Sequence, residues 1–184
     1  MYKPSEDSFF FAEFLEKYFS RIKKEKIKIL DMGSGTGILA ETCSKFIPKK
    51  NIFCADIQKD SIKILRKKGF RSVQSDLFSN IKGKFNLIIF NAPYLPEDPK
   101  EPQDSKIETT GGKRGDEISL NFLKNAFSHL KNKGKIFLLV SSLTPLDRIK
   151  KFNFKIIERK KIWFEELLIL EFENENRKSK KSLG

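Results

Sequence analysis

The chain has 184 residues, with 37 Lys and Arg against 24 Asp and Glu, which gives a formal net charge of +13. Hydrophobic residues make up 39% of it and 18 residues are Phe, so a packed core is expected and intrinsic disorder is excluded for most of the length. Two cysteines and one histidine (Cys43, Cys54 and His129) cannot supply a four-ligand zinc site. No apolar run is long enough to span a bilayer, so we expect one domain of a cytoplasmic protein without membrane association.

The pattern of apolar residues alternates between the spacing of helices and that of strands. In chain order it predicts a helix from Ser5 to about residue 24, a strand at 27–30, a helix at 38–46, a strand at 51–56, a helix at 59–68, and strands at 70–74 and 85–91. Residues 92–115 are irregular and rich in Pro and Gly, and loops of that length are usually functional. A helix at 116–131, a strand at 135–141, a short helix after Pro145, and strands at 154–159 and 163–172 joined through Lys160-Lys161 complete the prediction.

Repeated strand–helix units predict an α/β fold with a doubly wound, mostly parallel, seven-stranded sheet and helices on both faces. The last two strands are expected to form a C-terminal antiparallel hairpin, and the strand at 70–74 to be an edge strand. Residues 1–173 would form this domain, and the polar, basic segment 174–184 is expected to be a disordered tail. Ligands of such sheets bind beyond the carboxyl ends of the strands.

The first strand runs into Asp31-Met32-Gly33-Ser34-Gly35-Thr36-Gly37. Glycines at this position permit a tight strand-to-helix turn and let the backbone approach a ligand closely. The G-x-G-x-G spacing matches neither the dinucleotide fingerprint nor the phosphate-binding loop. A ligand loop without a phosphate cradle is therefore indicated, with a merely tight turn as the alternative.

Two aspartates follow the second and third strands. Asp56, 19 residues after Gly37, could accept hydrogen bonds from both hydroxyls of a ribose, and its neighbour Ile57 belongs to the same candidate site. Asp76 could accept from the amino group of an adenine, with Leu77 supplying a backbone amide and an apolar contact. Each aspartate could instead be a helix cap or a turn residue.

The tetrapeptide Asn91-Ala92-Pro93-Tyr94 ends the fourth strand. The side-chain carbonyl of Asn91 and the backbone carbonyl of Ala92 can each accept one N–H of a planar NH₂ group, which would aim its nitrogen at a methyl donor. Pro93 fixes the backbone, and Tyr94 offers a ring face to the planar group. An ordinary β-turn is the alternative interpretation.

These motifs resemble those of the class I S-adenosylmethionine-dependent methyltransferases with an Asn-Pro-Pro-Tyr signature. More narrowly, about residues 2–172 are similar to the HemK-related release-factor glutamine methyltransferases in their short archaeal and eukaryotic form. The segment Tyr2-Lys3-Pro4-Ser5-Glu6-Asp7-Ser8 is similar to the family's Tyr-x-Pro-Ala-Glu-Asp-Thr, and Leu95-Pro96 and Gly111-Gly112-x-x-Gly115 follow the tetrapeptide as they do there. One departure is Ala92, where the family has its first Pro, although Ala also supplies a backbone carbonyl.

The resemblance implies S-adenosylmethionine as cofactor and methyl transfer to the side-chain amide nitrogen of a glutamine, in the Gly-Gly-Gln loop of a translation termination factor. It also implies a small zinc-binding activator protein that pairs along a sheet edge. The implied catalytic residues are Asn91, Ala92, Pro93 and Tyr94. The implied cofactor residues are Ser8, Asp31, Gly33, Ser34, Gly35, Gly37, Asp56, Ile57, Asp76, Leu77 and Asn91.

Two other classes of function stay open. A nucleic-acid methyltransferase acting on adenine N6 or guanine N2 fits the tetrapeptide and the net charge of +13, although 30 of the 37 basic residues are Lys rather than Arg and they are spread along the chain. A non-catalytic RNA-binding or assembly module is the third, and the intact polar motifs argue against it. The loop from Pro96 to Gly115 mixes acidic and basic residues, which makes a poor phosphate track and favours a peptide substrate.

Overall fold

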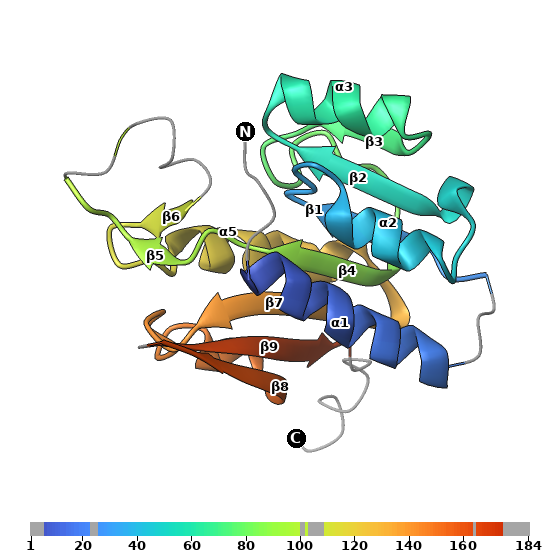
Figure 1. The fold of residues 1–184 in the computed structure, drawn as a ribbon. Coiled ribbons are helices and arrows are strands. Elements are labelled where there is room, and N and C mark those ends of the chain that lie inside the picture. The colour runs from blue at the N-terminus through green and yellow to red at the C-terminus, as the bar shows by residue number, and fades with distance from the viewer. Residues whose placement is uncertain (1–5, 23–25, 100–101, 103–108, 164, 175–184) are drawn as a thin grey trace, which may run out of the picture.

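The computed structural model describes residues 6–22, 26–99, 102, 109–163 and 165–174. Seven strands form one sheet in the order β3-β2-β1-β4-β7-β9-β8 (Figure 1). Their bounds are Ile29–Met32 (β1), Ile52–Asp56 (β2), Arg71–Gln74 (β3), Phe85–Asn91 (β4), Leu130–Ser141 (β7), Lys155–Ile162 (β8) and Glu165–Glu173 (β9). The first five in this order pair in parallel and β9 is antiparallel to both β7 and β8, so the predicted fold class is confirmed.

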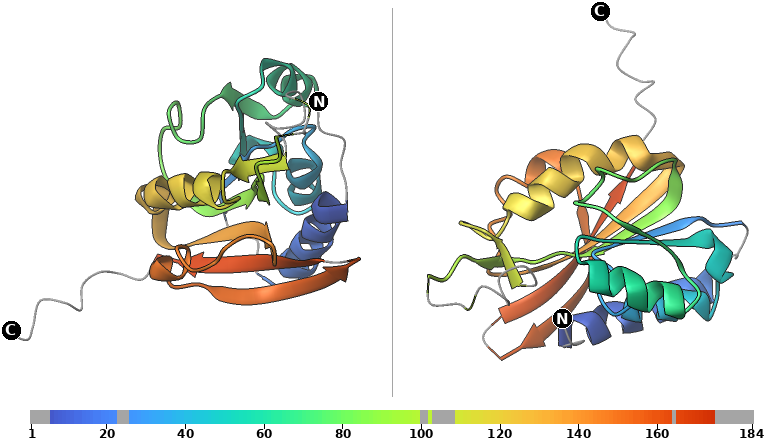
Figure 2. Two further views of the ribbon diagram at one scale, coloured as in Figure 1. Left: turned by 90° about the vertical axis from the view of Figure 1, so that its left-hand side faces the viewer. Right: turned by 90° about the horizontal axis from the view of Figure 1, so that it is seen from above.

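Helices cover both faces of this sheet. The α-helices are α1 (Glu6–Arg21), α2 (Ile38–Ser44), α3 (Lys59–Lys67) and α5 (Glu117–Ala126), and the single 3₁₀ turns are η1 (Lys49–Asn51), η2 (Phe127–His129) and η3 (Lys150–Phe152). One core cluster joins α1, α2 and α3 to one face, and a second joins α5 to the other face. The right-hand view of Figure 2 shows α5 on one side of the sheet and α1 and α3 on the opposite side.

The alternation of side chains along the central strands explains the two clusters. In β4, Leu87 and Ile89 belong to the cluster with α1, whereas Ile88 and Phe90 belong to the cluster with α5. Successive side chains of a strand point to opposite faces, so a continuous apolar run is what a strand buried on both faces requires. The carboxyl ends of β1 to β4 therefore lie at one edge of a rigid, doubly covered sheet.

Several boundaries differ from the sequence-based expectation. The helix expected at 116–131 ends at Ala126, because Leu130 pairs with Phe85 across an irregularity in the ladder and so extends β7. Asp31 and Met32 belong to β1 rather than to the loop after it.

The C-terminal segment also departs from the expectation. Lys160 and Lys161 pair within the ladder of β8 and β9, so they are not the hairpin link; the turn follows Ile162, at Trp163 with φ of 36°. The short helix expected after Pro145 is replaced by turns and η3. Asn174, expected in the tail, is tied to β7 by its backbone N–H, which donates to the Gly134 carbonyl at 3.0 Å.

The irregular segment contains two short strands that pair in parallel, β5 (Leu95–Pro96) and β6 (Thr110–Gly112). They extend beyond the carboxyl end of β4 in Figure 1. Some of the expected features lie outside the described residues: the N-cap Ser5 and the rest of residues 1–5, the loop residues 100–101 and 103–108, and the tail at 175–184.

At one end of the sheet β3 pairs only with β2, so the expected edge position of this strand is confirmed. Within the described ranges, no helix is both long and apolar enough to cross a membrane.

Candidate active site

A cavity of about 640 Å³ opens at the carboxyl ends of β1 to β4. The start of α1, the loops that follow these strands, the β5–β6 pair and one side of α5 line it. Nine of the eleven predicted cofactor residues line this cavity, and so do all four predicted catalytic residues. The two exceptions are Asp31 and Gly37, which lie behind the lining.

The glycine loop needs glycine at two of its positions for reasons of space as well as of backbone conformation. Gly33 has φ of 62°, and a Cβ there would lie 2.9 Å from Cε2 of Phe90. Gly37 has φ of 92°, and a Cβ there would lie 2.9 Å from Cδ2 of Leu65. The loop can pass close to the sheet only because these side chains are missing, and this close passage leaves the cavity open above it.

Ser34 fastens the loop between two strands. Its hydroxyl donates to the backbone carbonyl of Asp31 at 2.7 Å, and its backbone N–H donates to the carbonyl of Ala55 at 3.1 Å. These bonds satisfy buried polar groups that a loop in this position would otherwise leave unpaired. The glycine loop is therefore a fixed part of the cavity wall.

Asp56 ends β2 with its carboxylate already engaged. One oxygen accepts from the backbone N–H of Gly35 at 2.7 Å and the other from that of Gln58 at 2.8 Å. An ionised carboxylate has about four lone-pair sites, so each oxygen can still accept a hydroxyl proton. The two backbone bonds hold the carboxylate in place, which suits a group that binds the two hydroxyls of a ribose.

Asp31 is a buried acidic residue behind the glycine loop. Its side chain is 1% exposed, and neither carboxylate oxygen has a hydrogen-bond partner among the described residues. Burial, and to a smaller extent the charge of Asp56, raises the pKa of the Asp31 carboxyl to about 8. A buried carboxylate without a partner is costly, and a cationic ligand above it would offset that cost.

Asp76 and Leu77 lie on the turn after β3. Leu77 adopts a left-handed conformation with φ of 44°, and the Ser75 hydroxyl donates to its carbonyl at 2.6 Å. Phe78 anchors the turn from below by stacking on His129, with ring centroids 4.7 Å apart. The turn thus presents an exposed carboxylate and an apolar side chain to the cavity.

Asn91 ends β4 with a side-chain amide whose two ends have different surroundings. The Nδ2 group lies 3.2 Å from Oδ2 of Asp7 and 3.3 Å from Oγ of Ser8, both on the first turn of α1. The Oδ1 atom is buried and has no hydrogen-bond partner among the described residues. Asn91 lines the cavity, and its Oδ1 is an acceptor that no described group of the protein uses.

The backbone of the tetrapeptide packs against glycines in β6 and just after it. A Cβ at Gly111 would lie 2.7 Å from the carbonyl oxygen of Pro93, and one at Gly115 would lie 2.5 Å from that of Tyr94. Gly111 has an ordinary φ, so close packing alone demands glycine there. The motif Gly111-Gly112-x-x-Gly115 therefore supports the backbone of residues 92–94 after β4, which we call the strand-four loop. We call the motif its brace.

An ion pair with one buried partner secures the same brace to the rest of the fold. Asp116, at the start of α5, has no solvent exposure, and both of its oxygens contact the guanidinium of Arg148. Arg148 also reaches Glu117 at 3.0 Å. A bidentate pair of this kind is directional, so it fixes α5 relative to the segment after β7.

Some lining residues carried no sequence signal that we used. Thr110 and Asn121 come from β6 and α5, and no motif marks them. Asp7 belongs to the segment that resembles the family's Tyr-x-Pro-Ala-Glu-Asp-Thr and is an acidic residue in the first turn of a helix, but the sequence assigned it no role in the site. The contact between Asp7 and Asn91 spans 84 residues of sequence and becomes visible only in the fold.

The donor set suits S-adenosylmethionine, which combines a sulfonium, an amino acid, a ribose and an adenine. The unpartnered carboxylate of Asp31 suits its positive charges, and the fixed carboxylate of Asp56 suits its ribose hydroxyls. Ile57 and Leu77 offer apolar contacts where a base could lie. The loop glycines leave space for a ligand without phosphates.

Comparison with known proteins agrees with this chemistry. Residues 9–161 match the family model of the methyltransferase small domain. A protein of Methanocaldococcus jannaschii, named on a provisional basis as a protein N5-glutamine methyltransferase, is 35% identical over 184 residues, 92% of this chain and 90% of that protein. The release factor glutamine methyltransferase of Deinococcus radiodurans is 29% identical over 126 residues, 62% of this chain and 45% of its own length.

Among solved structures, the 16S rRNA N2 G1207 methyltransferase of T. thermophilus, in complex with AdoMet and guanosine, has a TM-score of 0.65 at 17% identity and covers 94% of this chain and 44% of that one. The sheet order and the cavity define an S-adenosylmethionine-dependent methyltransferase. Within that class, the chain belongs to the methyltransferase small domain family.

Proposed function

We propose that this enzyme methylates the side-chain amide nitrogen of a glutamine in a protein, and that the protein is a translation termination factor with a Gly-Gly-Gln loop. The observation that carries the proposal is the buried, unpartnered Oδ1 of Asn91, held at the end of the cavity next to Ala92. The names of the two relatives described above support glutamine as the acceptor. The reaction would then take place in the cytoplasm, where such factors act.

The chemistry demands orientation more than acid–base catalysis. An amide nitrogen is a poor nucleophile because its lone pair is delocalised into the carbonyl group. When bound, the cofactor supplies an electrophilic methyl group. Asn91 and Ala92 would each accept one N–H of the acceptor, which turns the nitrogen toward the methyl group and stabilises the positive charge that develops on it. Tyr94 would pack its ring against the planar amide.

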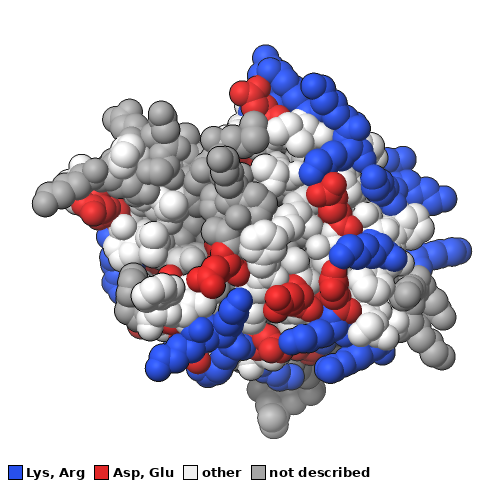
Figure 3. Space-filling model, in the orientation of Figure 1, with Lys and Arg blue, Asp and Glu red and all other residues white. Residues whose placement is uncertain are grey.

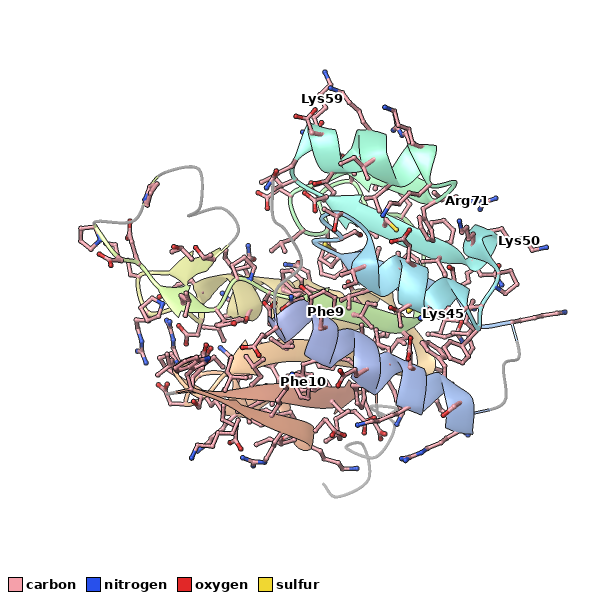
Figure 4. The ribbon with its side chains drawn as sticks, viewed as in Figure 1. Phe9, Phe10, Lys45, Lys50, Lys59 and Arg71 are labelled. Atoms are coloured by element: carbon pink, nitrogen blue, oxygen red, sulfur yellow. The ribbon has the colours of Figure 1, made fainter. Side chains whose placement is uncertain are left out.

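The distribution of charge favours a protein over a nucleic acid at the cavity mouth. Figure 3 shows Lys and Arg side chains gathered over α3 and along the opposite end of the sheet, with acidic side chains between them. Figure 4 places Lys45, Lys50 and Arg71 at the end where β2 and β3 begin, away from the cavity. Among the described residues that line the cavity, Glu97 on the β5 side is acidic and exposed, and none is Lys or Arg. A phosphate backbone would meet repulsion there.

The test is transfer of a tritiated methyl group from S-adenosylmethionine. Wild-type protein should label a termination factor with an intact Gly-Gly-Gln loop and leave the same factor unlabelled when Glu replaces that glutamine. The matched pair separates the amide from every other acceptor on the factor. Labelling of RNA or DNA together with an unlabelled factor would make the nucleic-acid methyltransferase the correct interpretation.

We also propose that a small zinc-binding activator protein pairs with this enzyme along the edge strand β3. The support is the resemblance of the motifs and the position of β3, whose outer side has no strand of the described residues beside it. An open strand edge is prone to unwanted pairing, so natural proteins cover or shorten it. A partner strand would serve this purpose and would leave the cavity accessible.

A further inference from the structure

The side-chain amide of Asn91 has a specific orientation, and its neighbours on α1 determine which one. An amide has a donating end and an accepting end of nearly equal size, so its surroundings decide which end faces the cavity. On one side Nδ2 lies between Oδ2 of Asp7 and Oγ of Ser8, at 3.2 and 3.3 Å. On the other side Oδ1 is buried without a partner among the described residues.

Of these two neighbours, only Asp7 discriminates between the ends of the amide. An ionised carboxylate accepts hydrogen bonds and cannot donate, whereas a hydroxyl can do either. The hydroxyl of Ser8 donates to Oδ1 of Asp7 at 3.3 Å, so Asp7 also decides that Ser8 accepts from Asn91. If the amide of Asn91 were reversed, its oxygen would face the carboxylate, and its NH₂ group would face the acceptor substrate. Both contacts would then be repulsive.

Asp7 is itself held firmly. Its side chain is 8% exposed, and its Oδ1 accepts from the backbone N–H of Ser8 at 2.6 Å. The following turns of α1 bury Phe10, Phe11 and Phe14 against the sheet, which fixes the position of the helix. The carboxylate therefore approaches Asn91 from a rigid support.

We infer that Asp7 is a positioning residue, which holds the amide of Asn91 so that its carbonyl oxygen faces an NH₂ acceptor. The inference rests on the proposed function for the identity of that acceptor, but it applies to any planar NH₂ group. It assigns a role in the reaction to an acidic residue to which the sequence motif gave none. Asp7 acts through Asn91 and needs no contact with the acceptor.

The first test is Asp7→Asn, which keeps the size of the side chain and removes its selectivity. An amide at position 7 can pair with either end of Asn91, so both orientations become populated. We expect kcat for methyl transfer to fall about tenfold while the Kd of S-adenosylmethionine changes less than about twofold. The matched control is Glu6→Gln, which removes an exposed carboxylate from the same helical turn and should leave kcat unchanged.

The decisive test is to exchange the two residue types. Asn91→Asp alone places two carboxylates side by side and should cost about a hundredfold in kcat or more. The double variant Asp7→Asn with Asn91→Asp restores a donor facing an acceptor, with one carboxylate oxygen left for the substrate. Its kcat should exceed that of Asn91→Asp by at least about tenfold, a rescue that a merely structural role would not produce.

The outcomes separate this inference from the proposed function. If the fold loss of kcat in the double variant equals the product of the losses in the two single variants, and all melting temperatures stay close to that of the wild type, the role of Asp7 is overturned. If the wild type labels a nucleic acid and not a glutamine, the proposed function fails. The double variant is then assayed with that nucleic acid as the substrate. Rescue of kcat supports the inference about Asp7, and losses of kcat that multiply contradict it.

Discussion

At the scale of single residues, the site separates cofactor binding from acceptor orientation. Asp56 and Asp31 lie at the ends of β2 and β1, around the glycine loop, whereas Asn91 lies at the end of β4 and contacts α1. Variants of Asp56 should therefore change the Kd of S-adenosylmethionine, whereas variants of Asn91 should change the rate of methyl transfer.

Asn91→Ala should abolish methyl transfer and leave cofactor binding within about twofold of the wild type, because the residue acts on the acceptor nitrogen. Asp56→Ala is the contrasting variant. It removes charge-assisted hydrogen bonds and should weaken S-adenosylmethionine binding by about 1.5–3 kcal/mol. Isothermal titration calorimetry with a single-turnover assay measures both quantities. Weak cofactor binding in Asn91→Ala, or unchanged binding in Asp56→Ala, would show that the two assignments are wrong.

Asp31 makes a prediction about pH. Its carboxyl pKa is raised from 3.8 to about 8 in the folded, ligand-free protein. The folded state then retains a proton that the unfolded chain has lost, so this stabilisation is complete below about pH 4 and is lost as the pH rises through about 8. Asn at position 31 does not titrate. We therefore expect the Tm of Asp31→Asn, relative to that of the wild type, to increase as the pH rises from about 5 to about 9, measured without ligand. A difference in Tm between the two proteins that stays constant with pH would contradict the raised pKa of Asp31.

At the scale of elements, the strand-four loop depends on the brace behind it. Gly111→Ala places a Cβ 2.2 Å from the carbonyl oxygen of Gly115 and 2.7 Å from that of Pro93, so one of these backbones must move. We expect methyl transfer to fall at least about tenfold, since a displacement of this size disturbs acceptor alignment, while cofactor binding stays within about twofold.

The control for this variant is Gly83→Ala, at a position with φ of 95° and open space around it. It should lower stability through backbone strain and leave kcat alone. Equal effects of the two variants on kcat would mean that Gly111 contributes only to general stability.

The elements also show what could be inferred from the sequence. The fold class and the four loop motifs could be predicted from the sequence, because burial on both faces leaves a strong apolar pattern in β1, β2 and β4 and polar motifs follow the strands. The full order of the strands could not. The extension of β7 to Leu130 could not be predicted from the sequence, since it depends on pairing with Phe85 on another strand. Likewise, a contact between Asp7 and Asn91 leaves no local pattern at either position.

At the scale of the whole molecule, binding of the cofactor should stabilise the fold, because the cavity joins loops from four parallel strands. With S-adenosylmethionine at about 100 times its Kd, the free energy of unfolding should rise by about 2.7 kcal/mol. For a chain of this size that corresponds to an increase in Tm of roughly 5–10 °C. Differential scanning fluorimetry measures it, with Asp56→Ala as the control that should gain much less.

The proposed activator makes a second prediction at this scale. Made alone, the enzyme should be poorly soluble or weakly active, and co-expression with a small zinc-binding partner should correct this. Ser72→Pro, in β3, should weaken the complex, because alternation along the strand turns the N–H of Ser72 toward the open edge: two positions that alternate with it, Val73 and Ser75, face β2, where Ser75 N–H donates to the Asp56 carbonyl at 2.9 Å. A monodisperse, fully active monomer would contradict the proposal for the partner and leave the catalytic assignment intact.

The central claim is that the nitrogen at Asn91 and Ala92 belongs to a glutamine side chain. Tandem mass spectrometry tests it most directly, on a termination factor incubated with the enzyme and S-adenosylmethionine. We predict the mass of one added methyl group on the glutamine of the Gly-Gly-Gln loop, located by fragment ions to the side-chain amide, and its loss with Asn91→Ala. An unmodified glutamine beside methylated RNA or DNA from the same reaction would contradict the account.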